Sequence, residues 1–394
     1  MKSLFTTSQE AALIHISNHA HYANTLQITK ALKPEQPIQC FSPRKLKEQI
    51  QLFTQVFNQD VAYAVKANPS PQIIKSAYDM GITTFDVASL AEIELITKNA
   101  PQAKIHYHNP IRSNHEIEVA FKSYNCKRFA IDDMDELNNL FNIIGPNPEI
   151  EIAVRFRLPK ASSAIHDFSE KFGANQENAV CLLKQTKALG YKAILTFHPG
   201  SQCTTPQGWC DHIKAAASIT QNANVKLDRL NIGGGFPVPY TGNKKYLLTR
   251  FFDAIKQATQ KEFKNPPTLE CEPGRAIVAP SISLITQVKA VRAATREVYI
   301  NDGIYGSLLE MSQAKQLTPK YKVIRDGTYL KGPIQPFIVY GPTCDPLDRL
   351  PDQFELPLDI KQGDFIEFEH LGAYGAATTT SFNGYGTAEI VYVN

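Results

Sequence analysis

Lys66 is the first residue whose type and position could support chemistry, because it lies in the apolar run "VAYAVKAN" at residues 61 to 68. An ammonium held at the end of a buried strand either pairs with a carboxylate or has its pKa lowered, so that it can act as a nucleophile. Taken alone, Lys66 is better explained as a lysine that extends from a strand end to solvent.

A possible phosphate site follows much later in the chain. Three glycines lie in "NIGGGFP" at residues 231 to 237, and Arg275 ends "EPGR" at residues 272 to 275. Small residues let backbone N–H groups approach phosphate oxygens, and a guanidinium can bind the same group with two hydrogen bonds. A glycine run by itself could be only a tight turn, but glycines together with an arginine favour a phosphate group.

Glu272, three residues before that arginine, could be a general base, a structural ion pair or a partner for a protonated ring nitrogen. An amine nucleophile, a phosphate site and a carboxylate together predict pyridoxal phosphate, whose aldehyde bonds to an amine and whose protonated ring withdraws electrons. His198 could lie over that flat ring, although a core histidine bonded to backbone is the alternative.

Cys344 lies in "YGPTCDPLDRL" at residues 340 to 350, and it could be a buried filler, a metal ligand, half of a disulfide or a reactive thiol. The seven cysteines are an odd number and widely spread, which favours reduced thiols. Their spacings match no zinc site, so the sequence predicts neither a disulfide nor a bound metal.

The elements that must position these residues alternate between short β-rich runs and longer helical patterns from about residue 60 to 280. We expect eight strands, at residues 61–68, 83–89, 104–110, 128–133, 150–157, 192–201, 227–235 and 268–275. Eight successive βα units favour a (β/α)8 TIM barrel over a doubly wound open sheet. Nearly every strand turns polar at its C-terminal end, and in a barrel those ends converge on one face.

After about residue 280 the pattern changes to long β runs without helical crossovers. We therefore predict two domains: a cofactor-binding barrel at residues 41–280, and an antiparallel β-rich domain made of residues 1–40 and 281–394.

Composition excludes several classes of function. The net charge is +3, and lysines and arginines are scattered, which argues against nucleic-acid or membrane partners. The N-terminal region lacks the uninterrupted apolar stretch of a signal peptide, and no run is long enough to span a bilayer, so we expect a cytoplasmic protein.

An ordered set of motifs resembles one family, the fold-type III pyridoxal-phosphate decarboxylases, which have an alanine racemase-like barrel. The motifs are "YAVKAN", "FDVASLAEIE", "HPGSQ", "GGGFP", "EPGR", "NDGIYGS", "YGPTCDPLD" and "GAYGAATTTSFNGYG". They extend over roughly residues 40 to 390, and the cysteine motif is similar to that of the ornithine decarboxylase branch.

The resemblance implies roles for individual residues. Lys66 would bond to the cofactor aldehyde, Glu272 would pair with the ring nitrogen and His198 would stack on the ring. The phosphate would be held by Ser201, Gly235, Arg275 and Tyr374, while Asp86, Glu92 and Arg155 would lie around the lysine and ring. Family members are homodimers with shared active sites, so Cys344 and Asp345 would act on the neighbouring chain's site. A thiol suits proton delivery to the decarboxylated carbon, since its ordinary pKa of about 8.5 lets it donate near neutral pH.

The chain departs from the family pattern after "NDGIYGS", where ornithine decarboxylases carry an aspartate that binds the distal amine of the substrate. Glu310 is the only acidic residue between Asp302 and Asp326. Glu310 could take over this contact, Asp345 could make it alone, or the substrate could differ. The leading prediction is decarboxylation of L-ornithine to putrescine in polyamine biosynthesis.

Other substrates and classes stay open. Lysine, arginine, diaminopimelate or an amino-acid conjugate are alternative substrates, with diaminopimelate disfavoured by "CDPLD". A non-catalytic regulator resembling antizyme inhibitor is the alternative of another class, but Lys66, His198, Glu272, Arg275 and Cys344 are all retained. A racemase on a similar barrel is disfavoured by the cysteine motif.

Overall fold

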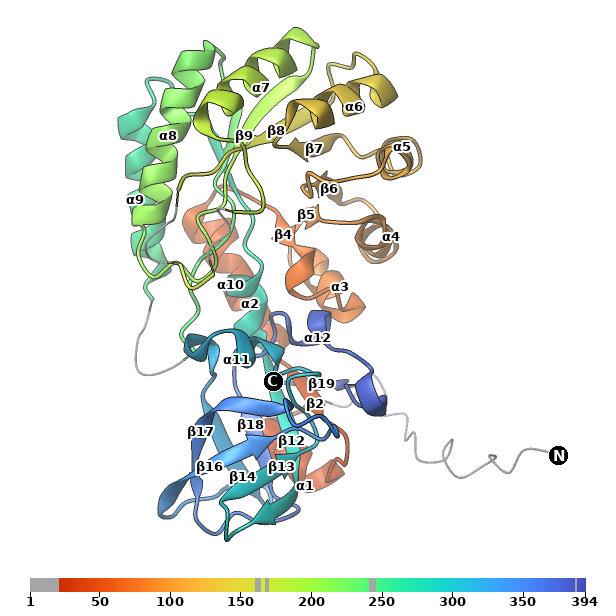
Figure 1. Cartoon of the computed structure of the whole chain (residues 1–394), viewed down its shortest axis with the longest axis vertical. Coiled ribbons are helices and arrows are strands. Elements are labelled where there is room, and N and C mark those ends of the chain that lie inside the picture. Colours follow the sequence, from red (N-terminus) through yellow and green to blue (C-terminus); the bar gives the residue numbers. More distant parts are fainter. Residues whose placement is uncertain (1–20, 160–163, 167–169, 241–245, 387) are drawn as a thin grey trace, which may run out of the picture.

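The computed structural model describes residues 21–159, 164–166, 170–240, 246–386 and 388–394. The chain forms a parallel barrel surrounded by helices and a second, mixed sheet that lies beyond one end of it (Figure 1). The predicted fold class is confirmed. The predicted domain boundaries stay a prediction, and residues 1–20 of the second domain lie outside the described residues.

The barrel closes because its first strand pairs with both neighbours. This strand is divided at Ala62 into β3 (Asp60–Val61) and β4 (Tyr63–Ala64), which pair with the last and the second strand respectively. The other strands follow in chain order and in parallel: β5 (Thr84–Val87), β6 (Lys104–Tyr107), β7 (Arg128–Ile131), β8 (Glu151–Arg155), β9 (Lys192–Thr196), β10 (Arg229–Asn231) and β11 (Thr268–Cys271). The eight predicted strands therefore correspond to the strands of the barrel.

Helices with apolar inner faces cover the barrel: α3 (Pro71–Asp79), α4 (Leu90–Asn99), α5 (Asn114–Lys122), α6 (Met134–Ile144), α7 (Gln176–Ala188), α8 (Gln207–Ala223) and α9 (Leu248–Glu262). Local signals begin several of them; Ser113 and Glu116, for example, form a capping box at α5. After β11 comes only the short α10 (Arg275–Val278). Helix α2 (Pro43–Gln51) precedes the first strand, continues as η1 (Leu52–Phe57) and packs against α10. A segment before the barrel thus supplies the cover that an eighth crossover helix would give.

The second sheet joins both ends of the chain. Its main path runs β1 (His21–Tyr22), β19 (Glu389–Val393), β2 (Ile38–Phe41), β12 (Ile282–Arg292), β13 (Glu297–Ile300), β16 (Ile334–Tyr340) and β17 (Arg349–Pro357), with β18 (Phe365–Phe368), β14 (Tyr321–Arg325) and β15 (Thr328–Tyr329) as a branch. Most described pairs are antiparallel, as expected, but β1 with β19, β19 with β2, and β13 with β16 are parallel. The first two pairs are parallel because the N-terminal strands β1 and β2 add on either side of the C-terminal strand β19, whereas β13 and β16 both lie within the C-terminal part.

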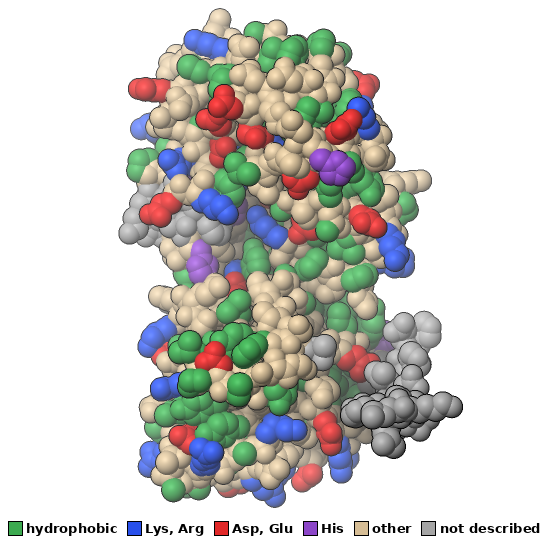
Figure 2. Space-filling view, turned by 45° about the vertical axis from the view of Figure 1, so that its right-hand side comes forward, with side chains coloured by type: hydrophobic (Ala, Val, Ile, Leu, Met, Phe, Trp, Pro, Cys, Tyr) green, Lys and Arg blue, Asp and Glu red, His purple; other side chains and the backbone are tan. Residues whose placement is uncertain are grey.

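Short helices complete both parts. The barrel part contains η2 (Val65–Ala67) after β4, and η3 (Ala279–Ser281) leads from α10 into β12. The second part contains α1 (Thr25–Leu32), α11 (Leu309–Gln313), η4 (Lys315–Leu317), α12 (Gly375–Thr378) and η5 (Phe382–Gly384). The surface is hollowed between the barrel and the second sheet, and basic side chains are visible at this hollow (Figure 2).

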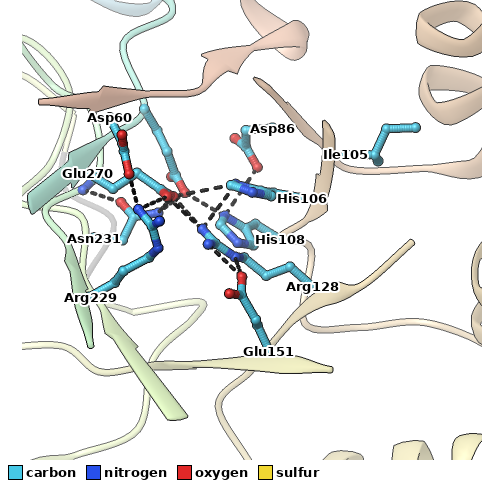
Figure 3. A network of polar contacts seen from close by, with 12 residues as sticks. Asp60, Asp86, Ile105, His106, His108, Arg128, Glu151, Arg229, Asn231 and Glu270 are labelled. Carbon is cyan, nitrogen blue, oxygen red and sulfur yellow. Dashed lines mark hydrogen bonds and ion pairs between the residues drawn. The ribbon is translucent and has the colours of Figure 1, made fainter. Parts of the chain in front are cut away.

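The barrel interior contains a buried network of charged side chains beside its apolar residues. Arg128, on β7, binds both oxygens of Glu270 at 2.6 and 2.7 Å and also binds Glu151, while His106 lies 3.4 Å from Glu270 (Figure 3). Burial alone raises the pKa of Glu270, but His106 and Arg128 lower it well below its ordinary value. The carboxylate is therefore ionised and depends above all on the Arg128 guanidinium, because burial lowers the pKa of His106.

This dependence predicts a large stability difference between two adjacent basic residues. Arg128→Ala leaves Glu270 buried and short of its guanidinium partner, so we expect a loss of about 3–5 kcal/mol in the free energy of unfolding. Lys127→Ala removes an exposed contact with Glu149 and one over the Phe121 ring, and should cost less than about 1 kcal/mol. Chemical denaturation monitored by circular dichroism measures both, and equal losses would contradict the inferred role of the network.

Candidate active site

Two adjoining cavities lie at the C-terminal ends of the barrel strands, where the sequence places its polar residues. The first has a volume of about 230 Å³ and is lined by Arg155, His108, Asn109 and Phe172 among others. The second is lined by Ser201, Gly235, Arg275 and Tyr374 among others. Lys66, Asp86, His198 and Glu272 line both cavities, so the structure brings the predicted cofactor residues together around one connected space.

Lys66 lies in η2, directly after β4. Its side chain is exposed to the cavity into which it projects. Burial by itself lowers the pKa of Lys66, but nearby negative charge, led by Asp86, raises it above its ordinary value. Burial and Glu272 in turn raise the pKa of Asp86 to about 7. Lys66 is therefore cationic here, and Asp86 is the carboxylate whose charge acts on it most strongly.

Glu272 directly follows β11 and is held by two side chains from other strands. Its Oε1 contacts Nδ1 of His108 and accepts a hydrogen bond from Nδ2 of Asn231 at 2.5 Å. Burial alone raises the pKa of Glu272, but the His108 contact lowers it to about 2, so the carboxylate is anionic at neutral pH.

His108 and Asn231 are absent from the predicted site. The sequence places His108 at the polar end of the third strand, in "HYHNP", but this local signal does not reveal that its ring meets Glu272.

His198 follows β9, and its Nδ1 accepts a hydrogen bond from the backbone N–H of Gly200 at 3.1 Å. Burial, reinforced by Lys66 and Arg155, holds the pKa of His198 well below its ordinary value. The imidazole is therefore neutral and carries its proton on Nε2. A neutral flat ring can stack on an aromatic cofactor without adding positive charge to it.

The second cavity has the features of a phosphate site. Gly235 has a φ of +91°, and a Cβ there would lie 2.1 Å from the carbonyl oxygen of Gly200, so only glycine fits. Tyr374 donates its backbone N–H to Ala67 at 2.6 Å, which brings this residue of the C-terminal part to the barrel. The Arg275 guanidinium lies 4.8 Å from the Tyr374 ring. A glycine-lined pocket with a buried guanidinium fits the phosphate of pyridoxal phosphate.

Glu310 lies on α11 and binds Arg275 through both carboxylate oxygens, at 2.5 and 2.6 Å. It therefore lies beside the second cavity, which Arg275 lines, and it is not a lining residue of the first cavity.

Cys344 and Asp345 lie outside both cavities of their own chain, in the segment between β16 and β17. Cys344 is exposed, and its backbone N–H donates to Oδ1 of Asn383 at 3.0 Å. The Tyr305 hydroxyl and the Leu347 N–H donate to Asp345 and lower its pKa, so this side chain is anionic.

The family is decided by a match to the family model of the pyridoxal-dependent decarboxylases, described as their pyridoxal binding domain, over residues 43–279. This chain belongs to that family. The decarboxylase is 29% identical to the lysine/ornithine decarboxylase of Selenomonas ruminantium, with 84% of this chain and 82% of the relative covered. It is 30% identical to mouse ornithine decarboxylase, with 84% and 74% covered.

Among solved structures, the decarboxylase resembles the arginine decarboxylase of Paramecium bursaria Chlorella virus, with a TM-score of 0.82 and 27% identity. The similarity covers 93% of this chain and 98% of that one. The predictions of a carboxy-lyase and of pyridoxal phosphate as cofactor are confirmed by the family. No helix within the described residues is long and apolar enough to cross a membrane. The roles of single residues stay predictions.

The fit of the glycine cradle can be tested with a matched pair of variants. Gly235→Ala places a methyl group against the Gly200 carbonyl, so we expect the purified decarboxylase to lose at least about tenfold in affinity for pyridoxal phosphate. Gly145 also has a positive φ, of +73°, but nothing lies within 4 Å of a Cβ there. Gly145→Ala should therefore cost about 1–3 kcal/mol of stability and leave cofactor affinity unchanged. Titration of the visible cofactor absorbance measures both, and equal affinities would contradict the assignment.

Proposed function

We propose that this decarboxylase converts L-ornithine to putrescine and carbon dioxide, in polyamine biosynthesis. The observation that carries the proposal is the single connected space in which Lys66 and Glu272 meet the glycines and Arg275 of a phosphate site. Bound pyridoxal phosphate supplies an aldehyde that captures the substrate amine and a ring that accepts the electrons left when carbon dioxide departs.

The side chains of the site would serve that chemistry in distinct ways. Lys66 is cationic and must lose a proton before its amine can bond, and Asp86, with a pKa near neutrality, is the acceptor that we assign to it. Glu272 stays anionic and would keep a ring nitrogen protonated. His198 stays neutral and would support the ring from one face, while Arg155 would lie at its edge.

A substrate with a second ammonium needs a carboxylate partner, since a buried unpaired charge is strongly disfavoured. We assign this contact to Asp345, which is anionic and lies in an exposed loop. Glu310, the other candidate, is engaged by Arg275 and would have to leave that ion pair to bind substrate. Asp345 is therefore the stronger candidate for the amine contact, with Glu310 as the alternative.

We further propose a homodimer in which each chain supplies Cys344 and Asp345 to the other chain's cavity. Both residues lie outside the cavities of their own chain. Exposed apolar side chains accompany the loop: Leu347 is 70% exposed and Phe382 is 41% exposed. Such side chains favour burial against a partner. Cys344 would then deliver the proton that replaces the departing carboxylate.

Lysine, arginine, diaminopimelate and an amino-acid conjugate stay alternative substrates. A non-catalytic regulator is disfavoured because Lys66, Glu272 and Arg275 all meet at the site and each would be dispensable in such a protein. A cytoplasmic location also stays a prediction.

The substrate assignment predicts carbon dioxide release from ornithine in preference to lysine, arginine, diaminopimelate and larger conjugates. Asp345→Asn should raise KM for ornithine at least about tenfold, because a charged hydrogen bond to the distal ammonium is lost. Glu310→Ala should leave that KM nearly unchanged if Asp345 makes the contact alone. Lys66→Ala should abolish turnover, whereas Lys75→Ala, a change at an exposed lysine on α3, should not. Preferred turnover of another amino acid would refute ornithine but leave the decarboxylase intact.

The shared site predicts recovery of activity when two inactive chains are mixed. A hybrid of Lys66→Ala and Cys344→Ala chains contains one site with both native residues, so full random exchange should restore roughly one quarter of native activity. Lys66→Ala chains mixed with the double variant provide the control, because no hybrid of these has an intact lysine. Failure to recover activity, with subunit exchange demonstrated by differently tagged chains, would count against the arrangement.

A further inference from the structure

We propose that His108 and Asn231 form a clamp that holds Glu272 through one carboxylate oxygen, and that His108 is a positioning residue for the cofactor ring. This inference deepens the proposed function, since it rests on the role proposed there for Glu272. The clamp leaves the second oxygen, Oε2, as the one that we assign to the ring nitrogen.

The clamp is built from three strands. His108 directly follows β6, Asn231 ends β10 and Glu272 directly follows β11. Nδ1 of His108 and Nδ2 of Asn231 both reach Oε1 of Glu272. The His108 side chain is 8% exposed and that of Glu272 is 11% exposed, so water competes little for these contacts. Since β5 and the first strand lie between β6 and β11 around the barrel, His108 must reach Glu272 across the interior.

The clamp is anchored in the polar network below it (Figure 3). Asn231 also donates to Oε1 of Glu270 at 3.1 Å, and Glu270 in turn binds Arg128 and His106. The His106 ring is stacked with that of His108, with centroids 5.4 Å apart. A change of the Glu272 rotamer would therefore break contacts to two side chains that are themselves held in place.

Charge acts in the same direction as geometry. His108 faces two carboxylates, Glu272 and Asp86, and its Nδ1 lies 3.5 Å from Oδ1 of Asp86. Arg128 and His106 are the other titratable groups near His108. The charges of Lys66 and Glu270 act on Glu272 itself. Burial alone lowers the pKa of His108, but Glu272 and then Asp86 raise it above its ordinary value. An imidazolium in this position keeps Glu272 ionised in an environment where burial and Glu270 favour the neutral acid.

One nitrogen of the clamp has no hydrogen-bond partner within the described part of the chain. Nε2 of His108 is buried there without a hydrogen-bond partner, while its ring lines the first cavity. Leaving such a donor unpaired is costly, so the position is suited to a bound molecule that supplies an acceptor.

The clamp predicts a change in the pH dependence of cofactor binding. Without the imidazolium the pKa of Glu272 rises. As the pH is lowered, Glu272 of the variant therefore becomes protonated at a pH at which Glu272 of the native protein is still anionic. For His108→Ala, affinity for pyridoxal phosphate should therefore fall more steeply than native affinity as the pH is lowered from about 8 to about 6, by about tenfold for each unit by which the raised pKa of Glu272 exceeds the pH. Equilibrium dialysis with pyridoxal phosphate over this range measures the difference without reference to turnover.

Two further variants distinguish positioning from a structural role. His108→Asn keeps a donor near the place of Nδ1 without the charge, so it should recover most of the affinity at about pH 8 but keep the steeper pH dependence. It also serves if the alanine variant does not fold. His115, exposed on α5, provides the matched control, and His115→Ala should behave as the native protein.

Native pH dependence in both His108 variants, or an equal loss at every pH, would overturn the clamp. This outcome is separate from failure of the proposed function, because a native protein that releases no carbon dioxide from any amino acid can still show the predicted binding profile.

Discussion

The active site depends on the closure of the barrel between its first and last strands. Ala62 donates its N–H to the carbonyl of Cys271 at 2.9 Å, and Val61 pairs with Cys271 in register. The chain after each of these strands enters the same space, so Lys66 and Glu272 become neighbours although almost the whole barrel separates them in sequence. The approach is close enough that a Cβ on Gly274 would lie 2.8 Å from the Cβ of Ala67. A slip of one residue would turn the alternate side chains of the strand to the other face and separate the amine from the carboxylate.

The barrel interior contains charged side chains that apolar residues could replace, and the site above them explains why they are present. Buried ion pairs are weak stabilisers, because desolvation offsets most of their attraction. In this chain, however, Glu270 and Arg128 connect through Asn231 to Glu272, and a carboxylate at a cofactor ring must stay both charged and fixed. An apolar replacement would remove a structural cost but leave Glu272 without its orienting contacts. The polar interior is therefore better explained by the site above it than by stability.

Much of the fold and part of the site could be predicted from local patterns. Periodicity and turn residues within short stretches of sequence predict the strands, the helices and the polar strand ends that contain Lys66, Asp86 and His198. The ring of His108 meets Glu272 only after the eight strands have closed into a barrel. The two residues are far apart in the sequence, so no short stretch of it contains both. The ion pair between Glu310 and Arg275 likewise requires α11 to pack against the end of the barrel. Two of the parallel pairs of the second sheet, β1 with β19 and β19 with β2, join strands from opposite ends of the chain, so no local pattern predicts them.

The contact between Glu310 and Arg275 bears on how this chain could recognise a basic substrate. Within the family pattern an acid in this segment would face the distal amine, yet here the only such acid, Glu310, is paired with Arg275. An acid cannot pair fully with a guanidinium and a substrate ammonium at once, because two cations would then compete for the same oxygens. Asp345 has no such competitor among the described residues, since its contacts are a hydroxyl and a backbone N–H. If two chains assemble as proposed, the negative charge available to the substrate would come mainly from the neighbouring chain, and specificity would depend on how far that loop reaches into the cavity.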